Sequence, residues 1–198
     1  MEEVKNVLLV GVGGQGIILA STILSRAALL TGHDVKNNEV HGMAQRGGSV
    51  VCQIRFGKKV HSPLISRGSA HYLIALEKLE ALRYLEFCSR TTKVVVNRQK
   101  IIPVTVTSGD AEYPEDIEDI LNRKLDHVQF VDALKIANEV GNDRAANVVL
   151  IGAMSGGLPF EDNVFEQAIE ASVKKGFLDM NIKAFYRGKE AVVGAETG

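Results

Sequence analysis

The glycine-rich turn GVGGQG at residues 11–16 is the first stretch whose residue types could do chemistry. It follows an apolar run at residues 7–10 and precedes a helical stretch that opens at residue 17. Glycines allow a close approach, and the free N–H groups of a helix start favour an anion. The candidate binding residues of the turn are Gly11, Gly13, Gly14, Gln15 and Gly16.

A dinucleotide site would need an acidic residue about 20 positions after the turn, to hold the ribose. Glu39 lies 39 − 16 = 23 positions past the last glycine, which fits. The next segment does not fit, because the glycines within residues 42–48 interrupt any helix and a strand pattern follows at once. Three interpretations stay open: a nicotinamide or flavin site, a site for another anion or a partner's backbone, and a purely structural turn.

A second loop, within EVHGMAQRGGSV at residues 39–50, combines a titratable histidine, a fixed positive charge, an amide and glycines. Such a loop can offer charge and amides to a carboxylate or phosphate. It can equally dock into a neighbouring subunit, and its Arg and Met favour that interface. No carboxylate partner supports a general-base role for the histidine. The candidate contact residues are His41, Gly42, Gln45, Arg46, Gly47 and Gly48.

The sequence offers no catalytic set and no metal-ligand spacing of its own. Ser62 lacks the G-x-S-x-G elbow of a nucleophilic serine, and no H-E-x-x-H or G-K-[ST] motif occurs. The only cysteines, Cys52 and Cys88, lie far apart, whereas an iron–sulfur cluster normally takes four thiolates. We therefore expect no catalytic residue, no metal and no bound cofactor in this chain alone, and two free thiols.

The elements that must position these loops follow from the apolar pattern. Strands are predicted at residues 5–12, 34–39, 49–57, the start of 71–88, 91–97 and 128–133. Helices are predicted at residues 16–30, the rest of 71–88, 113–123, 134–140, 144–154, 161–174 and 179–187. Residues 58–60 suggest a hairpin return or short edge, and the Pro-containing segment 101–106 suits an edge strand.

The pattern thus predicts an α/β fold, a single-domain sheet of mostly parallel strands flanked by helices. Its first βα unit is Rossmann-like and its continuation is not. The helix at residues 17–30 is apolar nearly all round, so something besides one sheet must cover it.

Length and charge limit the remaining possibilities. The 198 residues, 45% of them apolar, are consistent with one domain over residues 1–198. A net charge of −1 predicts no general attraction to nucleic acid or to an anionic membrane. With no secretory signal and no apolar span, we expect a cytoplasmic chain.

Five segments in order, GVGGQG, EVHGMAQRGGSV, VHSPLI, ALEKLEALR and NIKAFYRG, resemble the gamma domain of the 2-oxoacid:ferredoxin oxidoreductases. The HGMAQRGGSV form and the length are similar in particular to beta subunits of the indolepyruvate branch. The resemblance implies a thiamine diphosphate enzyme that decarboxylates a 2-oxoacid, reduces ferredoxin through iron–sulfur clusters and releases an acyl-CoA.

The resemblance also implies a division of labour between two chains. A larger alpha subunit would carry the thiamine diphosphate and the clusters, and coenzyme A would be a co-substrate. Residues 11–16 and 41–48 would then contact the alpha subunit or its active centre, with Arg46 near a phosphate or carboxylate. A homodimer, another 2-oxoacid such as pyruvate or a branched-chain keto acid, an NAD(P)-dependent oxidoreductase and a scaffold module remain alternatives.

Overall fold

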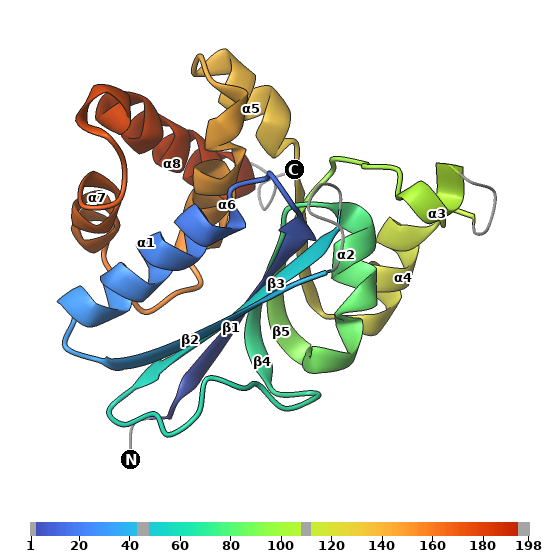
Figure 1. Cartoon of the computed structure of the whole chain (residues 1–198), viewed down its shortest axis with the longest axis horizontal. Coiled ribbons are helices and arrows are strands. Elements are labelled where there is room, and N and C mark those ends of the chain that lie inside the picture. The colour runs from blue at the N-terminus through green and yellow to red at the C-terminus, as the bar shows by residue number, and fades with distance from the viewer. Residues whose placement is uncertain (1–2, 43–47, 108–111, 194–198) are drawn as a thin grey trace.

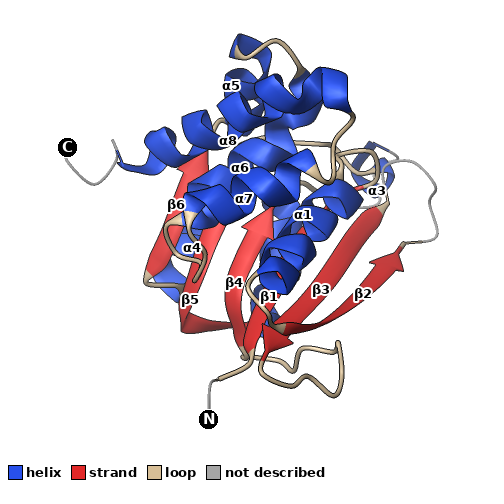
Figure 2. Ribbon diagram, turned by 90° about the vertical axis from the view of Figure 1, so that its left-hand side faces the viewer, coloured by secondary structure: helices blue, strands red, loops and turns tan. Residues whose placement is uncertain are grey.

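A six-stranded sheet with helices on both faces forms the centre of the computed structural model, which describes residues 3–42, 48–107 and 112–193 (Figures 1 and 2). The strands are β1 Lys5–Val12, β2 Asp34–His41, β3 Ser49–Gly57, β4 Ala70–Ala75, β5 Cys88–Asn97 and β6 His127–Val131. Their order in the sheet is β2-β3-β1-β4-β5-β6.

The strand directions confirm the predicted fold class. β1, β4, β5 and β6 pair in parallel, whereas β3 is antiparallel to both of its neighbours. The connection at residues 42–48 is too short for a parallel crossover, which needs about a dozen residues, so β3 returns beside β2. β3 therefore lies between β1 and β2, where a Rossmann fold would pair the first two strands directly.

The helices divide unequally between the two faces of the sheet. They are α1 Ile17–Leu30, α2 Lys78–Arg83, α3 Val104–Thr107, α4 Ile117–Lys124, α5 Ala133–Glu139, α6 Ala146–Ser155, α7 Asp162–Glu170 and α8 Leu178–Val193. Figure 1 shows α1, α5, α6, α7 and α8 on one side and α2, α3 and α4 on the other. No helix among the described residues is long and apolar enough to cross a membrane.

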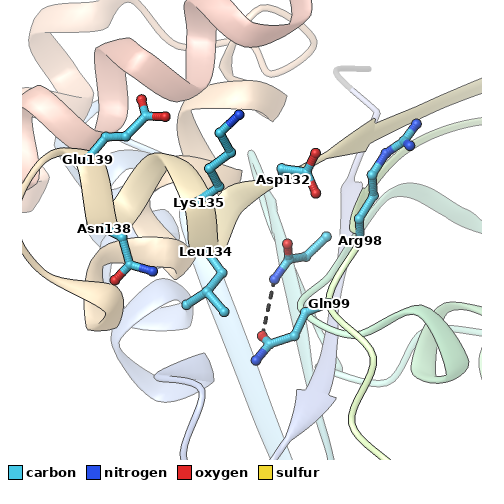
Figure 3. Close-up of a pocket in the computed structure, with 8 residues that line it drawn as sticks. Arg98, Gln99, Asp132, Leu134, Lys135, Asn138 and Glu139 are labelled. Atoms are coloured by element: carbon cyan, nitrogen blue, oxygen red, sulfur yellow. Dashed lines mark hydrogen bonds between the residues drawn. The ribbon is translucent and has the colours of Figure 1, made fainter.

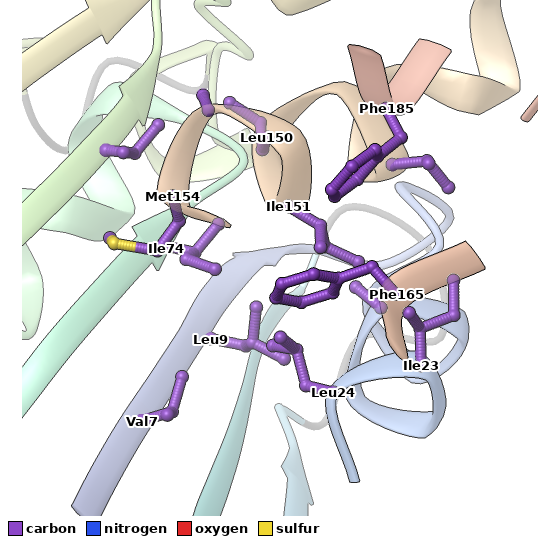
Figure 4. Close-up of a cluster of buried hydrophobic side chains, with 14 of the residues drawn as sticks. Val7, Leu9, Ile23, Leu24, Ile74, Leu150, Ile151, Met154, Phe165 and Phe185 are labelled. Carbon is purple, nitrogen blue, oxygen red and sulfur yellow. The ribbon is translucent and has the colours of Figure 1, made fainter. Parts of the chain in front are cut away.

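Alternate residues of the central strands supply two separate cores. Val7 and Leu9 of β1 point into the larger core with α1 and α6, while Leu8 and Val10 point into the smaller one. In the larger core Phe165 of α7 packs among the side chains of α1 and the sheet (Figure 4). α7 and α6 thus provide the additional cover predicted for α1.

That cover is incomplete on the outer side of α1. Ile18 and Leu29 remain 52% and 58% exposed. They lie eleven residues apart (29 − 18), about three helical turns, and so share one face of the helix.

Two of the expected edge segments are not strands. Residues 58–60 form a loop, in which the N–H of Val60 donates to Asp34 Oδ2 at 2.9 Å. In the second segment, residues 101–103 lead into α3 and residues 104–106 belong to it. Val106 and Thr107 of α3 donate from their N–H groups to the carbonyl of Pro103. Proline lacks an N–H and has a helix-compatible φ, so it suits this helix start as well as a sheet edge.

Candidate functional site

The candidate site lies at the carboxyl ends of β1, β4 and β5, the edge at which α/β sheets usually bind ligands. A cavity of about 340 Å³ opens there between the glycine turn and the start of α6. Its lining includes Gly14, Gln15, Gly16, Leu76, Asn97, Gln99, Arg144 and Asn147. A second cavity of about 700 Å³ continues toward α5 and shares Asn97, Gln99 and Leu134 with the first.

The glycines of the turn are required either by close packing or by a positive φ. Gly16 has a left-handed φ of 77° at the start of α1, and no side chain caps this helix. A Cβ at Gly16 would lie 2.4 Å from Asn147 Nδ2, and a Cβ at Gly11 would lie 2.9 Å from Leu76 Cβ. Gly14 has a φ of 99° but faces open space. The turn therefore needs Gly16 and Gly11 for packing, and Gly14 for its backbone conformation alone.

Gln15 is tied into the fold rather than projecting from it. Its Oε1 accepts from Val12 N–H at 2.7 Å, and its Nε2 donates to both Leu76 O and Gln99 Oε1 at 2.9 Å. This side chain therefore joins the ends of β1, β4 and β5.

Asn97, at the end of β5, completes this network. Its Nδ2 donates to Leu76 O at 3.1 Å and to Gln99 Oε1 at 3.3 Å, and its Oδ1 accepts from Ala133 N–H at 3.1 Å. Sequence reasoning missed both Asn97 and Gln99. The available signal was a polar residue that ends the buried strand KVVVN at the carboxyl edge of the predicted sheet.

The second cavity carries charges of both signs. Arg98, Asp132, Lys135 and Glu139 all line it (Figure 3). Arg98 lies 3.6 Å from Glu118 and stacks over the ring of Phe130. Because the opposite charges offset one another, this region has no strong preference for an anion.

The second loop of the sequence analysis, residues 39–50 and called the middle loop below, meets the glycine turn through a backbone hydrogen bond between described residues. Gly13 N–H donates to Gly48 O at 2.9 Å, and Gly42 N–H donates to Ser49 O at 2.8 Å. His41 and Gly42 are exposed. Gln45, Arg46 and Gly47 lie outside the described residues. The two loops singled out in the sequence thus come together at Gly13 and Gly48.

Two buried acidic side chains lie at α2, and sequence reasoning missed both. Glu80 binds Ser49 at the end of the middle loop, whereas Glu77 supports the start of α2. Glu80, 2% exposed, accepts from the Ser49 hydroxyl and from Arg83 Nη1 at 2.7 Å. Burial raises the pKa of Glu80 above its ordinary value. Glu77, 1% exposed, caps the N-terminus of α2 by accepting from the N–H of Glu80, and it also accepts from the hydroxyl of Tyr113.

The Rossmann position for a ribose-binding acid is not reproduced. Glu39 is exposed on β2, and β3 separates that strand from β1 and the glycine turn. Glu39, the acidic residue whose spacing fitted a nicotinamide site in the sequence, therefore does not support one in the fold.

The thiols do not fit an iron–sulfur cluster. Burial raises the pKa of Cys52 to about 12 and that of Cys88 to about 11, which disfavours the thiolate form. The sequence contains two cysteines, and a cluster normally takes four. Within the described ranges, no three His, Cys, Asp or Glu side chains gather as a metal-ligand set.

Comparison with known proteins shows similarity over nearly the whole chain. A family model described as pyruvate ferredoxin/flavodoxin oxidoreductase matches residues 6–191. The chain is 44% identical to the indolepyruvate oxidoreductase subunit IorB of Archaeoglobus fulgidus, with 96% of each chain covered.

Two solved structures share the fold at lower identity. A keto/oxoacid ferredoxin oxidoreductase gamma subunit from Geobacter sulfurreducens gives a TM-score of 0.70 at 23% identity, covering 96% of this chain and 99% of that one. The 2-oxoglutarate:ferredoxin oxidoreductase from Magnetococcus marinus, solved with 2-oxoglutarate, coenzyme A and succinyl-CoA, gives a TM-score of 0.74 at 18% identity. The similarity covers 97% of this chain but 31% of that longer chain.

Proposed function

Because the chain belongs to the pyruvate ferredoxin/flavodoxin oxidoreductase family, we propose that it is the small subunit of an indolepyruvate:ferredoxin oxidoreductase. The observation that carries the proposal is its near full-length similarity to an indolepyruvate oxidoreductase subunit. The reaction would be the oxidative decarboxylation of an aryl-pyruvate to an acyl-CoA. Residues 1–198 would act as one gamma-type domain, inactive by itself.

The proposal assigns the redox chemistry to a second, larger alpha subunit. That subunit would hold thiamine diphosphate and the iron–sulfur clusters and would reduce ferredoxin, with coenzyme A as co-substrate. The two free thiols of this chain, one buried and one half-buried, support the division, because they do not fit a cluster. The Magnetococcus marinus protein supports it as well, since the similar region there is part of a longer chain. Free thiols also fit a cytoplasmic location.

The surface proposed to meet the partner's active centre consists of the glycine turn and the middle loop. The contact between Gly13 and Gly48 at the carboxyl edge of the sheet supports treating them as one surface. Gly11, Gln15 and Gly16 serve internal packing, so the direct contacts are expected from the remaining candidates. These are Gly13, Gly14, His41, Gly42, Gln45, Arg46, Gly47 and Gly48.

Co-expression with a large thiamine- and cysteine-rich chain encoded beside this one tests the proposal. We expect the two chains to co-purify and to reduce ferredoxin with indolepyruvate faster than with pyruvate or a branched-chain keto acid. Failure to co-purify would contradict the proposed partner, and preference for another 2-oxoacid would contradict the proposed substrate.

The lone chain provides the matching control. It should show no cluster absorbance and no thermal shift with NADH. A saturable shift with NADH would instead support a nicotinamide-dependent enzyme that uses the turn at residues 11–16.

A further inference from the structure

The side-chain amide of Gln99 uses only its oxygen within the fold. Gln99 Oε1 accepts from Gln15 Nε2 at 2.9 Å and from Asn97 Nδ2 at 3.3 Å. Its Nε2 donates to no residue that the structure describes. Figure 3 shows the oxygen at the dashed hydrogen bond and the nitrogen at the opposite, free end of the group.

Backbone donors fix this orientation. A side-chain amide can normally be assigned either way round, but a backbone N–H can only donate. Val12 N–H therefore requires an oxygen at Gln15 Oε1, and Ala133 N–H requires one at Asn97 Oδ1. Gln15 and Asn97 consequently direct their NH2 groups at Gln99, so the group of Gln99 that accepts both hydrogen bonds must be its oxygen. The NH2 group of Gln99 is thereby turned away from the network.

Gln99 lines both cavities, and the smaller of the two, beside the glycine turn, has a largely apolar lining. Four leucines line the cavity together with Gln99: Leu19, Leu76, Leu134 and Leu150. Its two charged lining residues, Asp143 and Arg144, have opposite signs. The cavity thus combines apolar walls with a fixed N–H donor at its lining, and its charged lining residues cancel. Such a cavity suits a neutral aliphatic group with a carbonyl oxygen better than a bare phosphate.

We infer that Gln99 is a binding residue whose NH2 group donates to a neutral carbonyl oxygen on an aliphatic, amide-bearing arm of the ligand. The inference rests on the proposed function, in which coenzyme A, whose pantetheine arm has this chemistry, is a co-substrate. Gln15 and Asn97 are then positioning residues that act through Gln99.

A pantetheine titration of the isolated 15N-labelled chain tests the inference. In the wild type, the Gln99 side-chain NH2 signals should shift saturably. Gln99→Glu keeps an acceptor oxygen for Gln15 and Asn97 but replaces the free donor with an oxygen, so affinity should fall roughly tenfold. Gln167→Glu, exposed on α7, makes the same charge change and should bind like wild type.

Three results would overturn the inference: unmoved Gln99 NH2 signals, equal affinity of Gln99→Glu and wild type, or shifts produced by inorganic pyrophosphate but not by pantetheine. An unchanged melting temperature of Gln99→Glu separates lost binding from lost folding.

In the reconstituted complex, Gln99→Glu should raise the KM for coenzyme A while kcat stays within about twofold. A change in kcat alone would contradict a binding role for Gln99. A complex without indolepyruvate activity would refute the proposed function and leave the pantetheine titration valid.

Discussion

Asn147 of α6 donates from Nδ2 to the carbonyl of Gly16 at 2.8 Å, across 131 residues of sequence. Asn147 is 1% exposed, and its Oδ1 accepts from the N–H of Val148 at 2.8 Å. The side chain is therefore held at both ends. The C-terminal half of the chain thus fixes the point at which the glycine turn becomes α1.

Gly16→Ala should destabilise the fold more than Gly14→Ala. Both glycines have a left-handed φ, which costs a residue with a Cβ about 1–2 kcal/mol. The new Cβ at residue 16 would also lie 2.4 Å from Asn147 Nδ2, whereas at residue 14 it would meet open space. Urea unfolding of both variants measures the difference, and equal losses would contradict it.

The double variant Gly16→Ala/Asn147→Ala tests the steric clash between a Cβ at residue 16 and the side chain of Asn147. Asn147→Ala removes the hydrogen bond, but it also frees the space that the new Cβ needs. The loss in the double variant should therefore be smaller than the sum of the two single losses. Strict additivity would show that the two residues do not constrain each other.

Gly152→Ala and Gly188→Ala should each separate α6 from α8. A Cβ at Gly152 would lie 1.9 Å from Phe185 O, and one at Gly188 would lie 1.9 Å from Val149 O. Because these obstacles are backbone atoms, the helices must move apart, at about 1–3 kcal/mol or more. Thermal and urea unfolding measure the loss.

Gly156→Ala is the matched control for the glycines of α6 and α8. Gly156 follows α6 with helical φ and ψ angles and has open space around it. Its substitution should be neutral or stabilising by about 0.4–1 kcal/mol. A control variant as unstable as Gly152→Ala would refute the close-packing explanation.

Glu80→Gln should change how stability depends on pH. Burial raises the pKa of Glu80 above 4.5, so the folded state retains this proton longer than the unfolded state. Its contribution to stability is therefore fully present below 4.5 and is lost as pH rises through the folded pKa. The difference in melting temperature, Glu80→Gln minus wild type, should thus increase between pH 4.5 and neutral pH.

Glu170→Gln, at the exposed end of α7, provides the control for that pH series. Its melting temperature should keep a constant offset from wild type over the same range. A constant offset for Glu80→Gln as well would show that burial does not perturb this carboxyl group.

Arg46→Ala should reduce assembly or turnover of the proposed complex while leaving the melting temperature of the isolated chain unchanged. The reason is the proposed role of the middle loop in contacting the partner or an anionic group. Arg67→Ala is a suitable control, because Arg67 is exposed and pairs with Glu86 at 3.1 Å. Equal turnover of Arg46→Ala and wild type would contradict the contact role.

The predictions that succeeded were those with a local cause. The continuous apolar run of β1 and the glycine after it predicted the first βα unit, since buried strands and helix starts have local signals. The short connection between β2 and β3 predicted the non-Rossmann continuation. The predicted edge strand at residues 101–106 was wrong, because a proline such as Pro103 suits a sheet edge and a helix start equally.

The features that the sequence did not predict depend on contacts between residues distant in sequence. Gln15 and Gln99 meet across 84 residues, and neither has a local pattern that identifies the other. Glu80 resembles an ordinary charge of a surface helix until Ser49 and Arg83 enclose it. Likewise, Gly188 in NIKAFYRG carries part of the family resemblance, but its reason is the backbone of α6.

Steady-state reduction of ferredoxin by indolepyruvate and coenzyme A tests the central claim most directly, when purified partner subunit is titrated with this chain. We predict no turnover by this chain alone and a rate that rises and saturates at a fixed ratio of the two subunits. Turnover by this chain alone would contradict the claim. So would a partner subunit that reduces ferredoxin at the same rate with and without this chain.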